Sequence, residues 1–124
     1  MFKVKNLFDA VEADDGQRLW VEPTNLTADL REWCHVDHVL CHLGPTQKLS
    51  EWLEEHPDAY EQFRGVYHEA LSRSPFLLLL KRVAAAAQHE NFTLLHLSND
   101  PARNTGVALY EFLSELQAYV PPEE

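Results

Sequence analysis

Four segments of the chain show the hydrophobic pattern of short β-strands. The first alternates apolar and polar side chains, which is typical of a half-buried strand, and the last is almost wholly apolar, which indicates the centre of a sheet. The third is β-branched and apolar until Gly44-Pro45 ends it. The four predicted strands are residues 2–8, 17–21, 36–43 and 92–97.

Apolar residues at spacings of three and four predict helices between and after these strands. One of these helices opens at Ser74-Pro75, and its leucines run nearly all round, so we expect it to be well buried. The last begins within the run Ser98-Asn99-Asp100-Pro101. The predicted helices are residues 26–33, 46–55, 60–71, 76–89 and about 101–120.

This alternation of strands and helices predicts an α/β fold. We expect a single domain over residues 1–120, with a small parallel or mixed sheet of about four strands flanked by helices. A chain of 124 residues is long enough to bury one sizeable core. Residues 121–124, Pro-Pro-Glu-Glu, are expected to form a disordered tail.

The charge balance excludes some partners. Twenty acidic against ten basic side chains give a net charge of −10, which repels nucleic-acid phosphates and anionic membranes. Only Lys81-Arg82 forms an adjacent basic pair, so there is no basic stripe for nucleic acid to follow. The polar start of the chain does not resemble a signal peptide, and the two cysteines are expected to be free thiols. We therefore expect a cytoplasmic protein that binds neither nucleic acid nor membranes.

Several landmarks recur in a known family. They are Asp15-Gly16-x-Arg18-x-x-Val21-Glu22, Pro45, Leu49 and Trp52, His56-Pro57, Phe63-Arg64, Tyr67 and Glu69, Phe92-Thr93-Leu94-Leu95, Asp100 and Asn104. On these residues, the chain resembles the YeaO-like family of small bacterial proteins, a domain of unknown function (DUF488). The resemblance runs from about Lys3 to Leu113 and implies the fold, with little about function.

The departures from that family bear on function. After the second strand the family typically has aspartate-arginine-leucine-tryptophan-proline-arginine-glycine, whereas this chain has Glu22-Pro23-Thr24-Asn25-Leu26-Thr27-Ala28. The family also has an arginine where this chain has Asn99. Because arginine binds carboxylate and phosphate bidentately, the resemblance implies that this chain has lost or changed an anionic ligand. We expect a non-catalytic or degenerate member that binds a small polar ligand or a protein partner.

One candidate for a chemical site is the segment Cys34–His42, here called the Cys/His segment. It contains three histidines and two cysteines, and neutral imidazole and thiolate are the ligands that zinc prefers. On a helix four of these donors would share one face, but on the predicted strand they divide between two faces. That leaves His38 and His42 together, with His35 as a third ligand from the loop. We expect no physiological metal here and keep these three histidines as an alternative.

The end of the last predicted strand is the stronger candidate. In open α/β sheets, ligands bind beyond the carboxyl ends of the strands, beside helix amino termini. A ligand site there would use Glu22, Asn25, His96, Ser98, Asn99, Asp100 and Asn104. An enzyme would centre on His96, Asn99 and Asp100. The plainer interpretation is that Asp100 only caps a helix and His96 is a core residue.

The sequence lacks the common motifs of cofactor and catalytic sites. The chain has no nucleophile elbow, phosphate-binding glycine loop, His-Glu-x-x-His or dinucleotide fingerprint, so we expect no cofactor. A concave pocket around Glu22, Asn25, Ser98 and Asn104 would favour a binder or an enzyme. An exposed apolar patch would favour a protein partner instead.

Overall fold

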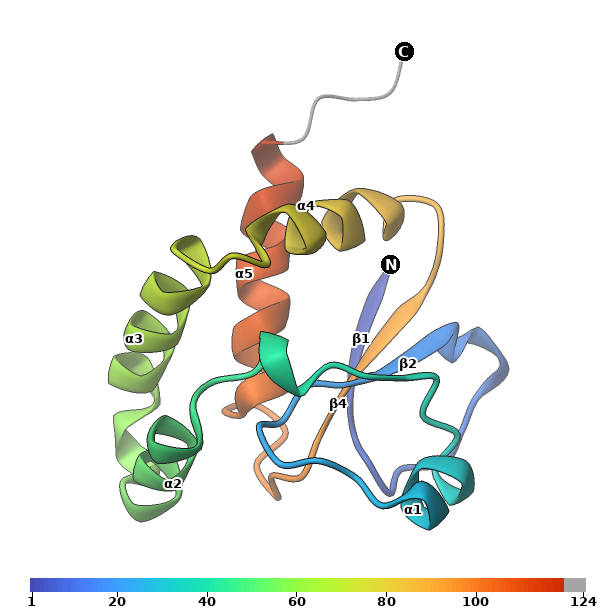
Figure 1. Ribbon diagram of the computed structural model, residues 1–124, viewed down its shortest axis with the longest axis horizontal. Coiled ribbons are helices and arrows are strands. Elements are labelled where there is room, and N and C mark those ends of the chain that lie inside the picture. Colours follow the sequence, from blue (N-terminus) through green and yellow to red (C-terminus); the bar gives the residue numbers. More distant parts are fainter. Residues whose placement is uncertain (120–124) are drawn as a thin grey trace.

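Four parallel strands form the sheet of this protein, as the computed structural model shows for residues 1–119 (Figure 1). The spatial order is β1-β4-β2-β3. The strands are β1 (Phe2–Asn6), β2 (Gln17–Trp20), β3 (His38–Val39) and β4 (Phe92–His96). The predicted α/β class and sheet are thus confirmed, while the predicted tail 121–124 and the last residue of the predicted domain lie outside the described residues.

Five α-helices accompany the strands in residues 1–119. They are α1 (Ala28–Trp33), α2 (Gln47–Glu55), α3 (Tyr60–Ser72), α4 (Leu77–Ala86) and α5 (Thr105–Tyr119). None of the helices in this part of the chain is long and apolar enough to cross a membrane.

The alternation of side chains along the strands builds a core on each face of the sheet. Leu19 and Leu94 belong to the larger cluster, which helices α2 to α5 cover. Trp20 and Leu95, their neighbours in sequence, belong to a smaller cluster that α1 covers (Figure 1). All five residues of β4 are buried, as expected for the central position predicted from its apolar run.

Two glycines are required where the chain passes close to other backbone. Gly16 has a φ of 62°, and a Cβ there would lie 1.9 Å from the Asn91 carbonyl oxygen. A Cβ on Gly44 would lie 2.3 Å from the Val21 carbonyl oxygen. Gly16 therefore lets the chain entering β2 pass close to the chain entering β4. Gly44 lets its loop pass close to the residue after β2, and it ends the region predicted as the third strand.

The Asp15-Gly16-x-Arg18 motif has a structural role. Asp15 and Arg18 are 1% and 2% exposed, and Arg18 Nη1 donates to Asp15 Oδ2 at 2.6 Å. Lys3 and Lys5 also contact the Asp15 carboxylate, at 3.1 and 3.0 Å. The motif thus connects the start of β2 to β1, across the intervening β4, through an ionic network centred on the buried Asp15.

Three predicted elements differ from the structure. The third strand is only two residues long, because residues 41–43 turn into a 3-10 helix whose Leu43 carbonyl accepts a hydrogen bond from the buried Tyr67 hydroxyl at 2.6 Å. The helix α4 is shorter than predicted and is not buried all round, since Leu78 is 61% exposed. The last helix begins only at Thr105, because residues 100–103 form a separate turn.

Candidate functional site

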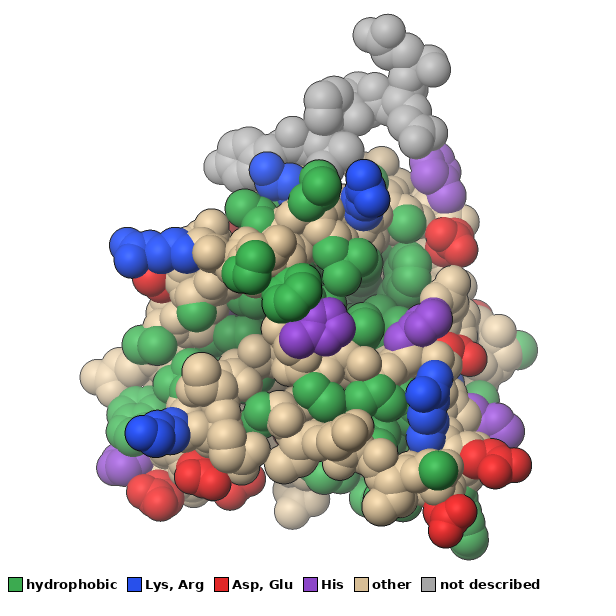
Figure 2. Space-filling model, viewed as in Figure 1, with side chains coloured by type: hydrophobic (Ala, Val, Ile, Leu, Met, Phe, Trp, Pro, Cys, Tyr) green, Lys and Arg blue, Asp and Glu red, His purple; other side chains and the backbone are tan. Residues whose placement is uncertain are grey.

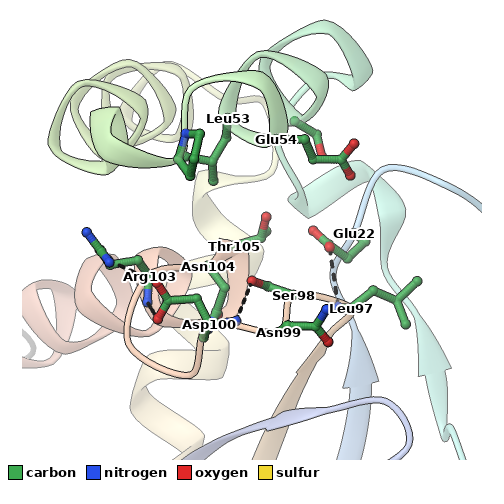
Figure 3. A pocket seen from close by; sticks show the side chains of 12 residues that line it. Glu22, Leu53, Glu54, Leu97, Ser98, Asn99, Asp100, Arg103, Asn104 and Thr105 are labelled. Atoms are coloured by element: carbon green, nitrogen blue, oxygen red, sulfur yellow. Dashed lines mark hydrogen bonds and ion pairs between the residues drawn. The ribbon is translucent and has the colours of Figure 1, made fainter.

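A crevice of about 450 Å³ opens at the carboxyl ends of β2 and β4 (Figure 3). Its floor comes from the loop between β4 and α5, and α2 forms the opposite wall (Figure 3). The lining residues are Glu22, Ser50, Leu53, Glu54, Pro57, Leu97, Ser98, Asn99, Asp100, Arg103, Asn104 and Thr105. This is the edge of a parallel sheet at which ligands characteristically bind.

Five of the seven residues predicted for a ligand site line this crevice. They are Glu22, Ser98, Asn99, Asp100 and Asn104. Asn25 does not line the crevice and is exposed on the loop before α1. His96 lines a second hollow, of about 580 Å³, which it shares with residues of β1 and with Asn99. The structure thus brings five of the predicted residues into one crevice and leaves Asn25 and His96 outside it, and ligand binding there stays a prediction.

Glu22 follows directly after β2 and is the most unusual side chain of the crevice. Its Oε2 accepts a hydrogen bond from the Leu97 amide at 3.4 Å, which is a long contact. Its Oε1 is fully buried and receives no hydrogen bond from any of residues 1–119. Burial raises the pKa of Glu22, and the negative charge of Glu54 adds to this, although the Thr105 hydroxyl and the Leu97 amide lower it. An incompletely solvated carboxyl therefore faces the crevice.

The loop that forms the floor is held by its own hydrogen bonds. Asp100 Oδ1 accepts from the amides of Ala102 and Arg103 at 2.9 and 3.2 Å, and its Oδ2 accepts from Arg103 Nε at 3.0 Å. These contacts lower the pKa of Asp100, the amide of Ala102 most strongly. Both carboxylate oxygens of Asp100 are therefore engaged within the loop, and Asp100 stabilises the turn that forms part of the crevice floor.

Asn104 joins this loop to α5. The side chain is 1% exposed; its Oδ1 accepts from the Val107 amide at 2.9 Å and its Nδ2 donates to the Asp100 carbonyl at 2.8 Å. Asn104, rather than Asp100, therefore caps the last helix. The capping role predicted for Asp100 applies to the preceding turn.

His96 is 2% exposed, and its Nδ1 accepts a hydrogen bond from the Ser98 amide at 3.0 Å. Burial lowers the pKa of His96, and Asp9 opposes this effect. His96 and Asp100 line different hollows, and Asn99 lines both. The three residues proposed for an enzyme therefore do not meet in one cavity, and His96 positions the loop instead.

The wall from α2 was missed from the sequence. Ser50, Leu53 and Glu54 line the crevice, and Glu54 belongs to the acidic pair Glu54-Glu55 at the end of α2. Glu54 is exposed, and its carboxyl faces Glu22 across the crevice (Figure 3). No local pattern signals this role, because it depends on where α2 packs.

The Cys/His segment scatters its donors. Cys34 is buried in the smaller core, His38 contacts Gln17 Oε1 at 3.0 Å on the exposed side of β3, and the ring of His42 lies 4.6 Å from that of Phe76. His35 has a left-handed φ of 53°. In residues 1–119 no three His, Cys, Asp or Glu side chains are placed to hold a metal ion. The alternative of a site at His35, His38 and His42 gains no support.

Hydrophobic side chains also gather on the surface near α4 (Figure 2). Phe76, Leu78 and Leu79 are 39%, 61% and 38% exposed at the start of this helix. Apolar patches of a few side chains are common on monomeric proteins. The polar crevice is therefore the more specific feature.

The comparisons with known proteins agree with the fold. A family model described as the inactive DUF488-N3 subclade matches residues 1–120. The chain belongs to this subclade. The predicted resemblance to DUF488 is thereby confirmed.

Uncharacterised mycobacterial proteins are similar to this DUF488 protein. One is an uncharacterised protein of Mycobacterium bovis, and two are uncharacterised proteins of Mycobacterium tuberculosis strains. Each is 26% identical over 87 residues, which cover 65% of this chain and 69% of the relative. No solved structure matches the chain significantly.

Proposed function

We propose that this DUF488 protein is a cytoplasmic, non-catalytic binder of a small polar ligand, which it holds in the crevice between α2 and the β4–α5 loop. The observation that carries the proposal is the crevice itself, with Glu22 incompletely hydrogen-bonded beside it. Concave sites with a few convergent polar groups are typical of small-molecule binding. A volume of about 450 Å³ suits a ligand of sugar or amino-acid size.

Two observations support a role without catalysis. Asp100 has both oxygens engaged, and His96 lines a different hollow, so the pair expected for an enzyme, His96 with Asp100, does not converge on the crevice. The description of the matching subclade as inactive agrees with this. A cytoplasmic location is supported by the free thiols of Cys34 and Cys41, which persist in reducing compartments.

Thermal denaturation with a ligand panel tests the proposal. The panel contains sugars, polyols, amines, amino acids, carboxylates, phosphates and nucleotides. A compound that binds only the folded state increases the free energy of unfolding and so raises the midpoint. The increase is about 2.7 kcal/mol when the ligand concentration is a hundred times Kd. We expect at least one compound to do so, with no chemical turnover.

A variant that fills the crevice locates the binding. Ser50→Trp places a large ring on the α2 wall, and Gln47→Trp puts the same ring on an exposed position of α2 outside the crevice. We expect Ser50→Trp to abolish the shift and Gln47→Trp to keep it. A shift that survives in Ser50→Trp, or the absence of any shift across the panel, would contradict the proposal.

A further inference from the structure

We infer that the crevice selects a ligand that carries a positive charge, such as a primary ammonium group. This inference rests on the proposed function and names the ligand class for the same crevice. It follows from the charges that line the cavity and from the hydrogen bonds that Glu22 lacks.

The charges lining the crevice are mainly negative. Three carboxyl groups, those of Glu22, Glu54 and Asp100, line it, and Arg103 is the only lysine or arginine among its lining residues. Arg103 Nε is bound to Asp100 Oδ2 at 3.0 Å, so these two charges largely compensate each other. Glu22 and Glu54 therefore determine the electrostatic potential of the crevice.

Glu22 is the group that a cation would complete. In the free protein its Oε1 is buried without a donor among residues 1–119, and the rest of the carboxyl has only the long contact from the Leu97 amide and the nearby Thr105 hydroxyl. The buried Tyr67 nearby donates its hydroxyl to the Leu43 carbonyl, which leaves none for Glu22. An ammonium group between Glu22 and Glu54 would donate up to three hydrogen bonds and reduce the repulsion between the two carboxylates.

The remaining lining groups suit the polar body of such a ligand. Ser50, Ser98 and Thr105 present hydroxyl groups, and Asn99 presents an amide. These groups can both donate and accept hydrogen bonds, so they can bind hydroxyl or amide groups of the ligand without selecting charge. Selection of a cation therefore falls to the two glutamates.

Matched compounds in which one functional group is cationic, neutral or anionic test the inference. One series is glucosamine, glucose and glucuronate; the other is 4-aminobutan-1-ol, 1,4-butanediol and 4-hydroxybutyrate. Binding to the full chain is followed by NMR through the backbone amides of residues 97–105. We expect the amine of at least one series to bind about tenfold more tightly than the neutral compound, and the carboxylate most weakly.

Variants and pH then identify the responsible groups. Glu22→Gln should remove the preference for the amine while keeping binding of the neutral compound, and Glu32→Gln, on exposed α1, should change neither. Lowering the pH through the pKa of Glu22, which burial and Glu54 raise, should weaken amine binding in the wild type only. The other charged or titratable groups facing Glu22 are Asp100 and Arg103 in the loop and Tyr67 on α3.

The outcomes separate this inference from the function on which it rests. Equal or tighter binding of the neutral or anionic compounds would overturn the inference and leave a polar-ligand site in place. An amine preference that persists in Glu22→Gln would also overturn it. If no compound of the panel or of either series perturbs residues 97–105, the proposed function fails and the inference fails with it.

Discussion

The Cys/His segment and the crevice differ in opposite ways: the donors of the segment are close in sequence but apart in space, and the residues of the crevice are far apart in sequence but close in space. The Cys/His segment holds five donor side chains in nine residues, yet the structure directs them into the core, onto β3 and against α4. The crevice collects residues from positions 22 to 105. The carboxyl ends of parallel strands meet at one edge, whereas backbone direction changes repeatedly between residues 34 and 42. In this protein, donors that are dense along the chain do not converge in space, whereas residues at the ends of neighbouring parallel strands do.

Removing the residue that anchors the crevice loop should have the largest effect. Asn104→Ala loses the cap of α5 and leaves the Asp100 carbonyl without its donor. Together, the lost cap and the unsatisfied buried group predict a loss of about 3 kcal/mol in the free energy of unfolding. Urea denaturation measures it.

Asn104→Ser is the matched control. Its hydroxyl oxygen can still accept from the Val107 amide and brings no charge into the buried position, so its cost should be smaller. A loss below about 1 kcal/mol in Asn104→Ala would show that the loop is held independently of this residue.

The next effect concerns pH. Burial lowers the pKa of His96 from its usual 6.5, so the unfolded chain binds the proton more tightly than the folded protein does. The contribution of His96 to stability is therefore complete above pH 6.5 and is lost as the pH falls from there toward the folded pKa. Protonation of Nδ1 also removes the acceptor of the Ser98 amide.

His96→Gln should flatten the decrease in stability between pH 7 and pH 5. Denaturation midpoints across this range measure the slope, with His38→Gln, an exposed position of the Cys/His segment, as control for the loss of one histidine. An unchanged slope in His96→Gln would refute the role assigned to His96 in holding the loop.

A smaller effect of opposite sign is expected at Glu22. Its pKa is raised in the folded state, so its contribution to stability is complete below the usual value of 4.5 and is lost as the pH rises through the folded pKa. Glu22→Gln should therefore increase the free energy of unfolding at pH 7 by up to about 1 kcal/mol, with no gain at pH 4. Glu32→Gln, with the same change of charge on exposed α1, should show no such gain. A loss of stability at pH 7 in Glu22→Gln would contradict the incomplete solvation of this carboxyl.

Hydrophobic periodicity predicted most of the fold, and it failed where contacts between residues distant in sequence determine the local structure. The central strand was evident from the apolar run at residues 92–97, and all five residues of β4 are buried. The long third strand was wrong because Tyr67, distant in sequence, binds the Leu43 carbonyl and stabilises a 3-10 turn. The prediction that α4 is fully buried was wrong because some of its apolar residues lie on a face exposed to solvent. Composition alone does not distinguish such a face from one that packs in the core.

The same limit applies to the crevice. The meeting of Glu22 with Ser98, Asn99, Asp100 and Asn104 was predictable because strand order places both strand ends together. Ser50 and Glu54 were not, since their approach depends on how α2 packs beyond the sheet. Asn104 rather than Asp100 caps α5 because residues 100–103 form a separate turn before this helix.

The smallest effect is expected from metals at the Cys/His segment. Three ligands are the minimum for a catalytic zinc site and four are usual for a structural one, but no such group converges in the described residues. Zinc chloride or EDTA should therefore move the thermal midpoint by less than about 1 °C, against several degrees for a bound structural ion. The double variant His38→Ala/His42→Ala should respond identically to the wild type, since both side chains are exposed. A zinc-dependent rise that this double variant abolishes would restore the segment as a metal site and reverse its ranking against the crevice.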